Sequence, residues 1–481
     1  MNLKRRIKNL FLPALLPLLS LTPPAHVFAQ TFTTLHAFAP TYLDAAGFYY
    51  TNIDGANPHV ALILSGNTLY GAAYNGGFYG SGTVFAINTD GTNFTNLHNF
   101  ARSAWVPVLS GGQAFTNSDG AMPFGQLILS GNALYGATSR GGTNGNGTVF
   151  KVNMDGTGFT NLHIFTAGDK NSISVYTNSD GAIPQTGLIL SGGTLYGTTF
   201  GGGLSGNGTL FSVDTNGMGF TNLHSFAVEE GNTPQGLVVV GSTLYGLMLL
   251  GGSLGGGSLF AVSIDGSNFT SLYSFGGDLF HPLALTVSGG TLYGTAPSGG
   301  DFGHGAVFSV GTDGSGLTTL YSFMDTANPQ AGVILSDNTF YGATTYNGIS
   351  GQGMLYKMNK DGSDFTNLYS FTGSDGINPT TQLVLSGQTL YGTAENDGSG
   401  GRGTVFSLSL TVVQPQLTVI PSIAGIVLTW PTNATGLTLQ STPTLASPVW
   451  TTNSAVPVVV NGQNTVTNPI SGAQQFYRLS Q

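Results

Sequence analysis

The stretch Ser65-Gly66-Asn67-Thr68-Leu69-Tyr70-Gly71 decides the fold, because close copies of it return six times along the chain. The intervals between successive core tyrosines are 65, 61, 49, 48, 48 and 50 residues. A period of this length is the signature of a repeat architecture, here with insertions in the early units. The later core tyrosines are Tyr135, Tyr196, Tyr245, Tyr293, Tyr341 and Tyr391. The 481 residues therefore predict one large repeat domain with a small appendage.

Each repeat contains four segments of strand length, which are clearest in the second repeat at residues 125–130, 133–138, 147–152 and 159–165. They are rich in β-branched and aromatic residues, and turn dipeptides such as Asp155-Gly156 separate them. No segment has a helical period. We therefore predict an all-β fold, a seven-bladed β-propeller in which each repeat supplies the four strands of one blade.

The third segment of each repeat indicates that both faces of a blade are buried. Val149 and Phe150 are adjacent, so they point to opposite sides of a strand, and both are large and apolar. Similar pairs occupy the same place in the other repeats, for example Val84-Phe85 and Leu210-Phe211. Blades that pack against neighbours on both sides require this pattern.

The two ends of the repeat array are complementary. The seventh repeat lacks the fourth segment, whereas residues 32–38, before the first repeat, match that segment. A first strand that completes the last blade would leave no unpaired edge. We therefore predict a propeller over residues 30–412 that is closed by an N-terminal strand. An open solenoid is the competing architecture, and the complementary ends argue against it.

The segments outside the repeats predict a signal peptide and a second domain. Residues 1–29 combine a basic start, an apolar run at 10–21 and the small-residue cleavage site Val27-Phe28-Ala29, as a signal peptide does. An uncleaved anchor is the alternative, but the apolar run is shorter than the roughly 20 residues that span a bilayer. We expect export to the cell envelope or beyond, with no transmembrane segment after cleavage. Residues 413–481 predict a small β-sandwich with Trp430 in its core.

Composition limits the partners. The net charge of −9 and pI of about 5.1 provide no basic surface for nucleic acid. The absence of cysteine excludes disulfides and thiolate metal sites. We expect a monomer whose partner is an extracellular glycan or an envelope protein.

The repeat unit L-x-L-S-G-x-T-L-Y-G, followed by a glycine-rich loop, G-T-V-F, N-x-D-G and F-T-x-L-H-x-F, resembles the tandem Gloeo_Verruco (GloVer) repeats. These repeats occur in exported proteins from Verrucomicrobia and cyanobacteria. The resemblance covers about residues 31–410 and implies neither an activity nor catalytic residues. The C-terminal segment resembles fibronectin- or immunoglobulin-like modules of the same bacterial group.

One face of the predicted propeller carries the variation between repeats. The long insertions at residues 39–58, 101–124 and 166–185 all connect a fourth segment to the next first segment. Function on repeat scaffolds usually lies on the face with elaborated loops, and aromatic side chains there could stack on sugar rings. Sequence drift and loop packing are the alternative explanations. The candidate ligand-binding residues are Tyr74, Tyr79, Trp105, Arg140, Phe200, Tyr346 and Glu395.

Four aspartates share the pattern Asp-Gly-x-x-Pro before the first segment of a repeat: Asp54, Asp119, Asp180 and Asp375. They are candidate ligands for Ca²⁺ or a polar molecule near the channel mouth, but an Asx turn with a positive-φ glycine is the interpretation that we favour. Four histidines, His36, His98, His163 and His224, occupy one slot of the fourth segment, where later repeats have tyrosine. That interchange favours aromatic packing or hydrogen bonding over a shared metal site.

No catalytic motif of the H-E-x-x-H type occurs. After the predicted cleavage site and outside the fourth segments, the remaining imidazoles are His59, His281 and His304, and none lies in a motif. The sequence therefore predicts a non-catalytic binding or surface-interaction module, with no cofactor except the Ca²⁺ considered above. A polysaccharide hydrolase or lyase and a structural envelope protein are the alternatives.

Overall fold

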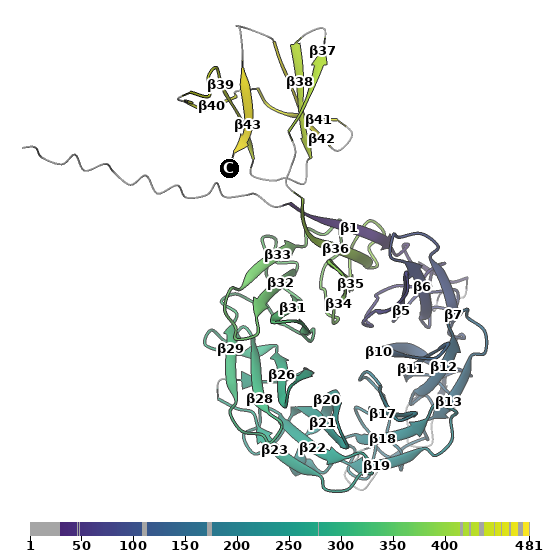
Figure 1. The fold of residues 1–481 in the computed structure, drawn as a ribbon. Helices are drawn as coiled ribbons and strands as arrows, with labels where there is room; N and C mark the ends of the chain where they lie inside the picture. Colours follow the sequence, from purple (N-terminus) through teal and green to yellow (C-terminus); the bar gives the residue numbers. More distant parts are fainter. Residues whose placement is uncertain are drawn as a thin grey trace, which may run out of the picture. The chain divides into compact units, whose positions relative to one another are not determined.

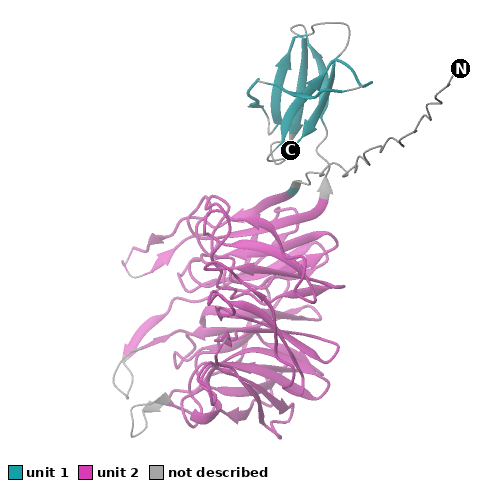
Figure 2. Ribbon diagram, turned by 90° about the vertical axis from the view of Figure 1, so that its left-hand side faces the viewer, with its two compact units in different colours: residues 1–30, 412–481 teal, residues 31–411 magenta. Residues whose placement is uncertain are grey.

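The computed structural model describes residues 29–45, 47, 49–107, 113–170, 176–277, 279–413, 417–422, 425–431, 437–446, 448–453, 455–460, 463–469 and 475–480. The chain divides into two compact units (Figure 2). The larger is Thr31–Thr411, and the smaller combines Met1–Gln30 with Val412–Gln481. The predicted signal peptide lies outside the described residues except for Ala29, so it stays a prediction.

The larger unit is all-β, as predicted. Its repeats form four-stranded sheets arranged around a common centre (Figure 1). The one helix among the described residues is the 3-10 turn η1 (Val228–Glu230). From the centre outward, six sheets each take their strands from one repeat: β4 (Ile63–Ser65), β5 (Thr68–Ala73), β6 (Thr83–Asn88) and β7 (Thr95–Asn99); β10 (Ala121–Ser130), β11 (Ala133–Arg140), β12 (Thr148–Asn153) and β13 (Thr160–Ile164); β16 (Ile189–Ser191), β17 (Thr194–Thr198), β18 (Thr209–Asp214) and β19 (Thr221–Ser225); β20 (Asn232–Val240), β21 (Thr243–Leu250), β22 (Ser258–Ser263) and β23 (Thr270–Ser274); β25 (Ala284–Ser288), β26 (Thr291–Ala296), β28 (Ala306–Gly311) and β29 (Thr318–Ser322); β30 (Ile334–Ser336), β31 (Thr339–Thr344), β32 (Met354–Asn359) and β33 (Thr366–Ser370).

The seventh sheet of this unit takes its strands from both ends of the repeat array. Its order is β34 (Val384–Ser386), β35 (Thr389–Ala394), β36 (Thr404–Val413) and β1 (Ala29–Ala37), with β1 outermost (Figure 1). The N-terminal strand therefore occupies the place that the last repeat leaves empty. Just beyond β1, the backbone N–H of Phe38 donates to the carbonyl of Gly403 at 3.0 Å.

The core of this unit lies between neighbouring sheets. Phe150 packs with Tyr70 and Val84 of the preceding sheet, whereas Val149 packs with Phe211 of the following sheet. Both Val149 and Phe150 are fully buried. The prediction that adjacent residues of the third segment bury both faces of a sheet is therefore confirmed.

Packing also explains the glycine of the Leu-Tyr-Gly motif. Gly136 lies opposite Phe150 in the β11–β12 ladder, and the phenyl ring covers the glycine. A β-carbon on Gly136 would lie 2.6 Å from Cζ of Phe150 and 2.7 Å from Cδ2 of Leu127, which no side chain tolerates without displacement. The same pairing occurs at Gly71–Phe85, Gly197–Phe211, Gly246–Phe260, Gly294–Phe308, Gly342–Tyr356 and Gly392–Phe406. The motif is therefore a packing element of the scaffold.

The long insertions form small hairpins. They pair β2 (Tyr42–Leu43) with β3 (Tyr50–Thr51), β8 (Ala104–Pro107) with β9 (Gln113–Thr116), and β14 (Asp169–Lys170) with β15 (Tyr176–Thr177). A fourth two-stranded sheet joins β24 (Leu279–Phe280) to β27 (Ser298–Gly299). The sequence does not predict these strands, because strands of two to four residues are too short to show a clear alternating pattern.

The smaller unit contains two sheets that share one core. Leu428, Trp430 and Val466 of one sheet pack with Leu439 of the other, and Trp430 is buried as predicted. The strands of the two sheets are β37 (Thr418–Ser422), β38 (Gly425–Pro431), β42 (Gln463–Asn468) and β41 (Val458–Val460), then β40 (Thr451–Thr452), β39 (Thr438–Thr442) and β43 (Phe476–Ser480).

Candidate functional site

The aspartates considered as metal ligands lie beside the outer strands of the sheets. Oδ2 of Asp119 lies 2.9 Å from Nε2 of His98, and Oδ1 accepts the backbone N–H of Ala101 at 3.0 Å. The equivalent pairs are His36–Asp54, His163–Asp180 and His224–Glu230, and Tyr369 donates to Asp375. Each carboxylate thus joins an outer strand to the loop that follows it. No group of three His, Asp or Glu side chains that could hold a metal occurs among the described residues.

The predicted turn is present in this motif, but its side-chain hydrogen bond comes from a different residue than the aspartate. In the first repeat, the carboxylate of Asp54 does not close the turn. Oδ1 of Asn52 instead accepts the N–H of Gly55 at 2.9 Å, and Gly55 has the expected positive φ of 105°. Asn117 and Asn178 make the same bond to Gly120 and Gly181. In these three repeats, the asparagine two residues before the aspartate is therefore the turn residue.

The histidine slot is explained by stacking between repeats. The His98 ring lies 3.7 Å from the Phe159 ring of the next repeat, with an interplanar angle of 5°. Tyr321 stacks on Phe365 in the same way at 4.0 Å. The other stacked pairs are His36–Phe94, His163–Phe220, His224–Phe269 and Tyr369–Phe32. At Tyr273 the next repeat has Leu317 in place of the phenylalanine. The predicted aromatic packing of this slot is confirmed, and the four histidines and Tyr369 also make hydrogen bonds.

Acid is expected to lower the stability of the larger unit by protonating Asp180, which accepts hydrogen bonds from His163 and Thr166. Burial opposes ionisation of Asp180, but hydrogen bonds from His163 and Thr166 outweigh it and hold the pKa of the carboxyl below its usual value. Because the folded pKa is depressed, this stabilisation is complete above the unfolded pKa of about 3.9 and is lost as pH falls through the folded pKa. Below about pH 4, the free energy of unfolding of Asp180→Asn should fall less steeply with pH than that of the wild type. Urea unfolding at several pH values measures this difference.

The matched control is Asp155→Asn in an exposed turn. Hydrogen bonds from Thr157 lower the pKa of Asp155, but solvent screens that group. Asp155→Asn should therefore change the acid profile less than Asp180→Asn. An equal change in both variants would show that the pairing with His163 adds nothing.

Two of the predicted ligand-binding residues meet around His59. Nδ1 of His59 lies 3.4 Å from Oε2 of Glu395 and 3.2 Å from Oγ1 of Thr380. The His59 ring also lies 4.6 Å from Phe124 and 6.5 Å from Tyr74. We call these five residues the His59 cluster. It brings the first and last repeats together, which the sequence separates by more than three hundred positions.

Tyr79 and Trp105 belong to a different group, on and around the first two hairpins. We define the aromatic hairpin surface as the exposed side chains of Tyr42, Tyr50, Phe78, Tyr79 and Trp105. Trp105 is 60% exposed and Tyr79 42% exposed, although both side chains are largely apolar.

Contacts between the first two hairpins hold this surface in place. Tyr49 donates to the carbonyl oxygen of Ser103, and the Arg102 guanidinium lies 4.9 Å above the Tyr49 ring. Arg102 also pairs with Asp44 at 2.6 Å. The Trp105 ring packs on Phe115 at 5.0 Å. The exposed rings therefore lie on hairpins that are held together by these contacts.

Arg140, Phe200 and Tyr346 stand apart from both groups. Arg140 ends β11, Phe200 follows β17, and Tyr346 follows β31 in the sixth repeat. Within the described part of the chain, no hydrogen bond or ring contact joins any of the three side chains to another predicted ligand residue. The structure thus divides the predicted set rather than gathering it into one site.

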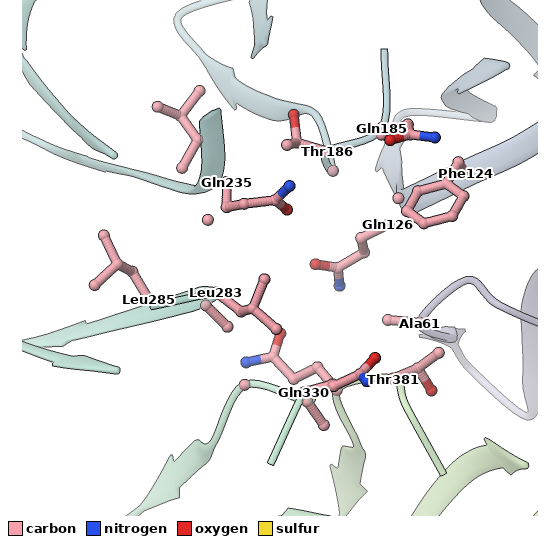
Figure 3. Close-up of a pocket in the computed structure, with 18 of the residues that line it drawn as sticks. Ala61, Phe124, Gln126, Gln185, Thr186, Gln235, Leu283, Leu285, Gln330 and Thr381 are labelled. Carbon is pink, nitrogen blue, oxygen red and sulfur yellow. The ribbon is translucent and has the colours of Figure 1, made fainter. Parts of the chain in front are cut away.

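A cavity of about 270 Å³ lies at the centre of the larger unit, and all seven repeats line it (Figure 3). The lining residues lie at or just before the first strand of each repeat, and His59 connects the cavity to the His59 cluster. Five glutamines line it: Gln126, Gln185, Gln235, Gln330 and Gln382. Sequence reasoning missed them, although the repeated pair Pro-Gln at Pro184, Pro234 and Pro329 was an available signal.

No helix in the described residues is long and apolar enough to cross a membrane. The sequence matches the model of a family described as the Gloeobacter/Verrucomicrobia repeat at residues 31–170, 107–278, 167–327 and 283–426. A search of curated proteins gives no match.

Several solved structures are similar in part. An oligogalacturonate lyase in complex with manganese is 12% identical, with a TM-score of 0.48 over 80% of this chain and 97% of that chain. The computationally designed Ika8 protein is 13% identical, with a TM-score of 0.42 over 74% and 98%. TolB from Acinetobacter baumannii is 13% identical, with a TM-score of 0.36 over 60% of each chain. Likenesses at this level assign neither a ligand nor a reaction.

Proposed function

We propose that this chain, which belongs to the Gloeobacter/Verrucomicrobia repeat family, is an exported, monomeric and non-catalytic binding module. In this proposal, a seven-bladed β-propeller closed by β1 carries a small C-terminal β-sandwich and binds an extracellular glycan through the aromatic hairpin surface. The signal peptide over residues 1–29 would direct export, and no cofactor takes part.

Contacts at the junction of the first and last repeats support the closed ring. The N–H of Asn57 donates to the carbonyl of Arg402 at 2.8 Å. The same bond links the first repeat to the second, through Met122 and Ser81 at 2.8 Å. A buried cluster that includes Phe38, Phe85 and Val405 also spans the junction. The junction is thus built like the internal borders between repeats.

The exposure of Trp105 and its aromatic neighbours carries the glycan proposal. Clustered, solvent-exposed aromatic rings are unfavourable in water and mark interaction sites on soluble proteins. An aromatic face gives a flat apolar surface, and the polar edges of tyrosine and tryptophan provide hydrogen bonds. The C–H faces and hydroxyl groups of a sugar chain complement both properties. Because contacts already hold the two hairpins together, binding would cost less conformational entropy.

Affinity electrophoresis in gels that contain soluble polysaccharides tests the proposal. The wild type should be retarded by at least one polysaccharide, and Trp105→Ala should abolish most of the retardation. Tyr346→Ala is the matched control, because Tyr346 is 46% exposed, similar to Tyr79, but lies outside the aromatic hairpin surface. Retardation that is lost equally in both variants, or by neither, would contradict binding at this surface.

An enzymatic alternative rests on the His59–Glu395 pair beside the central cavity. If the chain were a polysaccharide hydrolase or lyase, turnover of a polysaccharide should be measurable and should fall in Glu395→Gln. The binding proposal predicts no turnover in either protein. A chain that neither binds nor cleaves any polysaccharide would favour the structural role in the envelope.

A further inference from the structure

The central cavity is separate from the aromatic hairpin surface and shares no residue with it. We propose that this cavity is a second binding site, which takes a neutral, polyhydroxylated molecule about the size of one sugar ring. The proposal rests on the glutamine amides, on the absence of charge in the lining and on the size of the space. It does not depend on whether the hairpins bind a glycan.

The backbone that presents the glutamines is fixed by contacts between repeats. Gln185, Gln235 and Gln330 each follow a proline, and the residue before each proline has a positive φ of 60°, 60° and 51°. The proline ring packs against a glycine of the preceding repeat. A β-carbon on Gly147, for example, would lie 2.8 Å from Cδ of Pro184. The contacts of the proline therefore fix the backbone position of the residue that follows it, which is glutamine in these three repeats.

Four of the five amides have no protein partner. Gln382 donates to the carbonyl of Val333 at 3.1 Å, but the side chains of Gln126, Gln185, Gln235 and Gln330 make no hydrogen bond within the described structure. Figure 3 shows Gln126 and Gln235 reaching into the cavity. Each amide offers both donors and an acceptor, as does each hydroxyl group of a sugar. Polyols therefore match this lining better than ligands with acceptors alone.

Charge and shape restrict the ligand further. No Asp, Glu, Lys or Arg lines the cavity, and its one ionisable lining residue, His59, already contacts Thr380 and Glu395. A sugar acid or a phosphate would lose hydration without gaining a counter-charge. Phe124, Leu283 and Leu285 supply apolar surface for the C–H face of a ring. A volume of about 270 Å³ lies just below the roughly 300–1,000 Å³ of most ligand pockets, which favours a single ring.

Saturation-transfer NMR with the full chain tests this site, using a panel of neutral hexoses and pentoses with galacturonate as the acidic comparison. We expect at least one neutral sugar to bind and galacturonate not to bind. Gln235→Leu and Gln330→Leu should each weaken binding about tenfold in a titration, because one amide is lost. Leucine fits this slot, since Leu283 occupies it in the fifth repeat.

Two controls separate this site from the aromatic hairpin surface. Gln388→Leu changes an exposed glutamine outside the lining and should leave sugar binding unchanged. Trp105→Ala measures how much of the sugar signal arises at the aromatic hairpin surface. Equal melting temperatures would show that the leucine variants are folded. The proposal is overturned if no neutral monosaccharide binds the wild type, if Gln235→Leu and Gln330→Leu both bind as the wild type does, or if Trp105→Ala alone abolishes binding.

Discussion

Gly136→Ala is expected to destabilise the larger unit by about 1–3 kcal/mol, the usual cost of forcing a methyl group into a filled core. The new β-carbon would meet the Phe150 ring at 2.6 Å, and that ring is buried between two sheets. Neither the ring nor the neighbouring Leu127 can move without disturbing the next sheet. Chemical unfolding followed by circular dichroism measures the change.

A double-mutant cycle makes this prediction specific. Phe150→Leu should be destabilising alone, but the double variant Gly136→Ala/Phe150→Leu should lose less stability than the two single losses added together. Gly201→Ala is the matched control, because Gly201 also has an ordinary φ and its β-carbon would meet nothing closer than 3.8 Å. Additive losses, or an equal loss at Gly201, would show that the Gly136–Phe150 contact is not the cause.

Removal of residues 1–38 should have a still larger effect and abolish cooperative folding of the larger unit. The deletion takes away β1, leaves the edge of β36 unpaired and removes Phe38, which is fully buried. Loss of one buried phenylalanine costs about 3–5 kcal/mol, and a whole domain is stable by only about 5–15 kcal/mol. An unpaired edge strand also promotes aggregation.

A chain that lacks only residues 1–28 keeps β1 and is the control for that deletion. It should melt cooperatively and elute as a monomer in size-exclusion chromatography. The chain that lacks residues 1–38 should show a broad transition and high-molecular-weight species. Equal melting temperatures and equal elution of the two chains would mean that β1 does not complete the last sheet.

The strands were predictable because each repeat shows the same pattern several times. Adjacent apolar residues such as Val149 and Phe150 can only face opposite sides of a strand, so the double-sided burial followed directly. The complementary ends likewise predicted that β1 would lie beside β36. These inferences use local geometry and the period alone.

The site was less predictable, because it depends on contacts between distant segments. His59 meets Glu395 only through the junction of the first and last repeats, and no local pattern links the two residues. Tyr346 shares its sequence slot with Asn75, yet it contacts neither the His59 cluster nor the aromatic hairpin surface. Variation between repeats marks where change is tolerated, whereas convergence requires the three-dimensional arrangement.

The central claim of a ring closed by its N-terminal strand can be tested most directly by complementation. A synthetic peptide of residues 29–39 is titrated into the chain that lacks residues 1–38, and binding is measured by calorimetry alongside the melting temperature. A closed ring predicts 1:1 binding and restoration of the cooperative transition, as in other cases of strand addition. A peptide that carries Phe32→Ser and Phe38→Ser should not bind. Failure of the unmodified peptide to bind a chain that is itself folded and monomeric would contradict the closed ring.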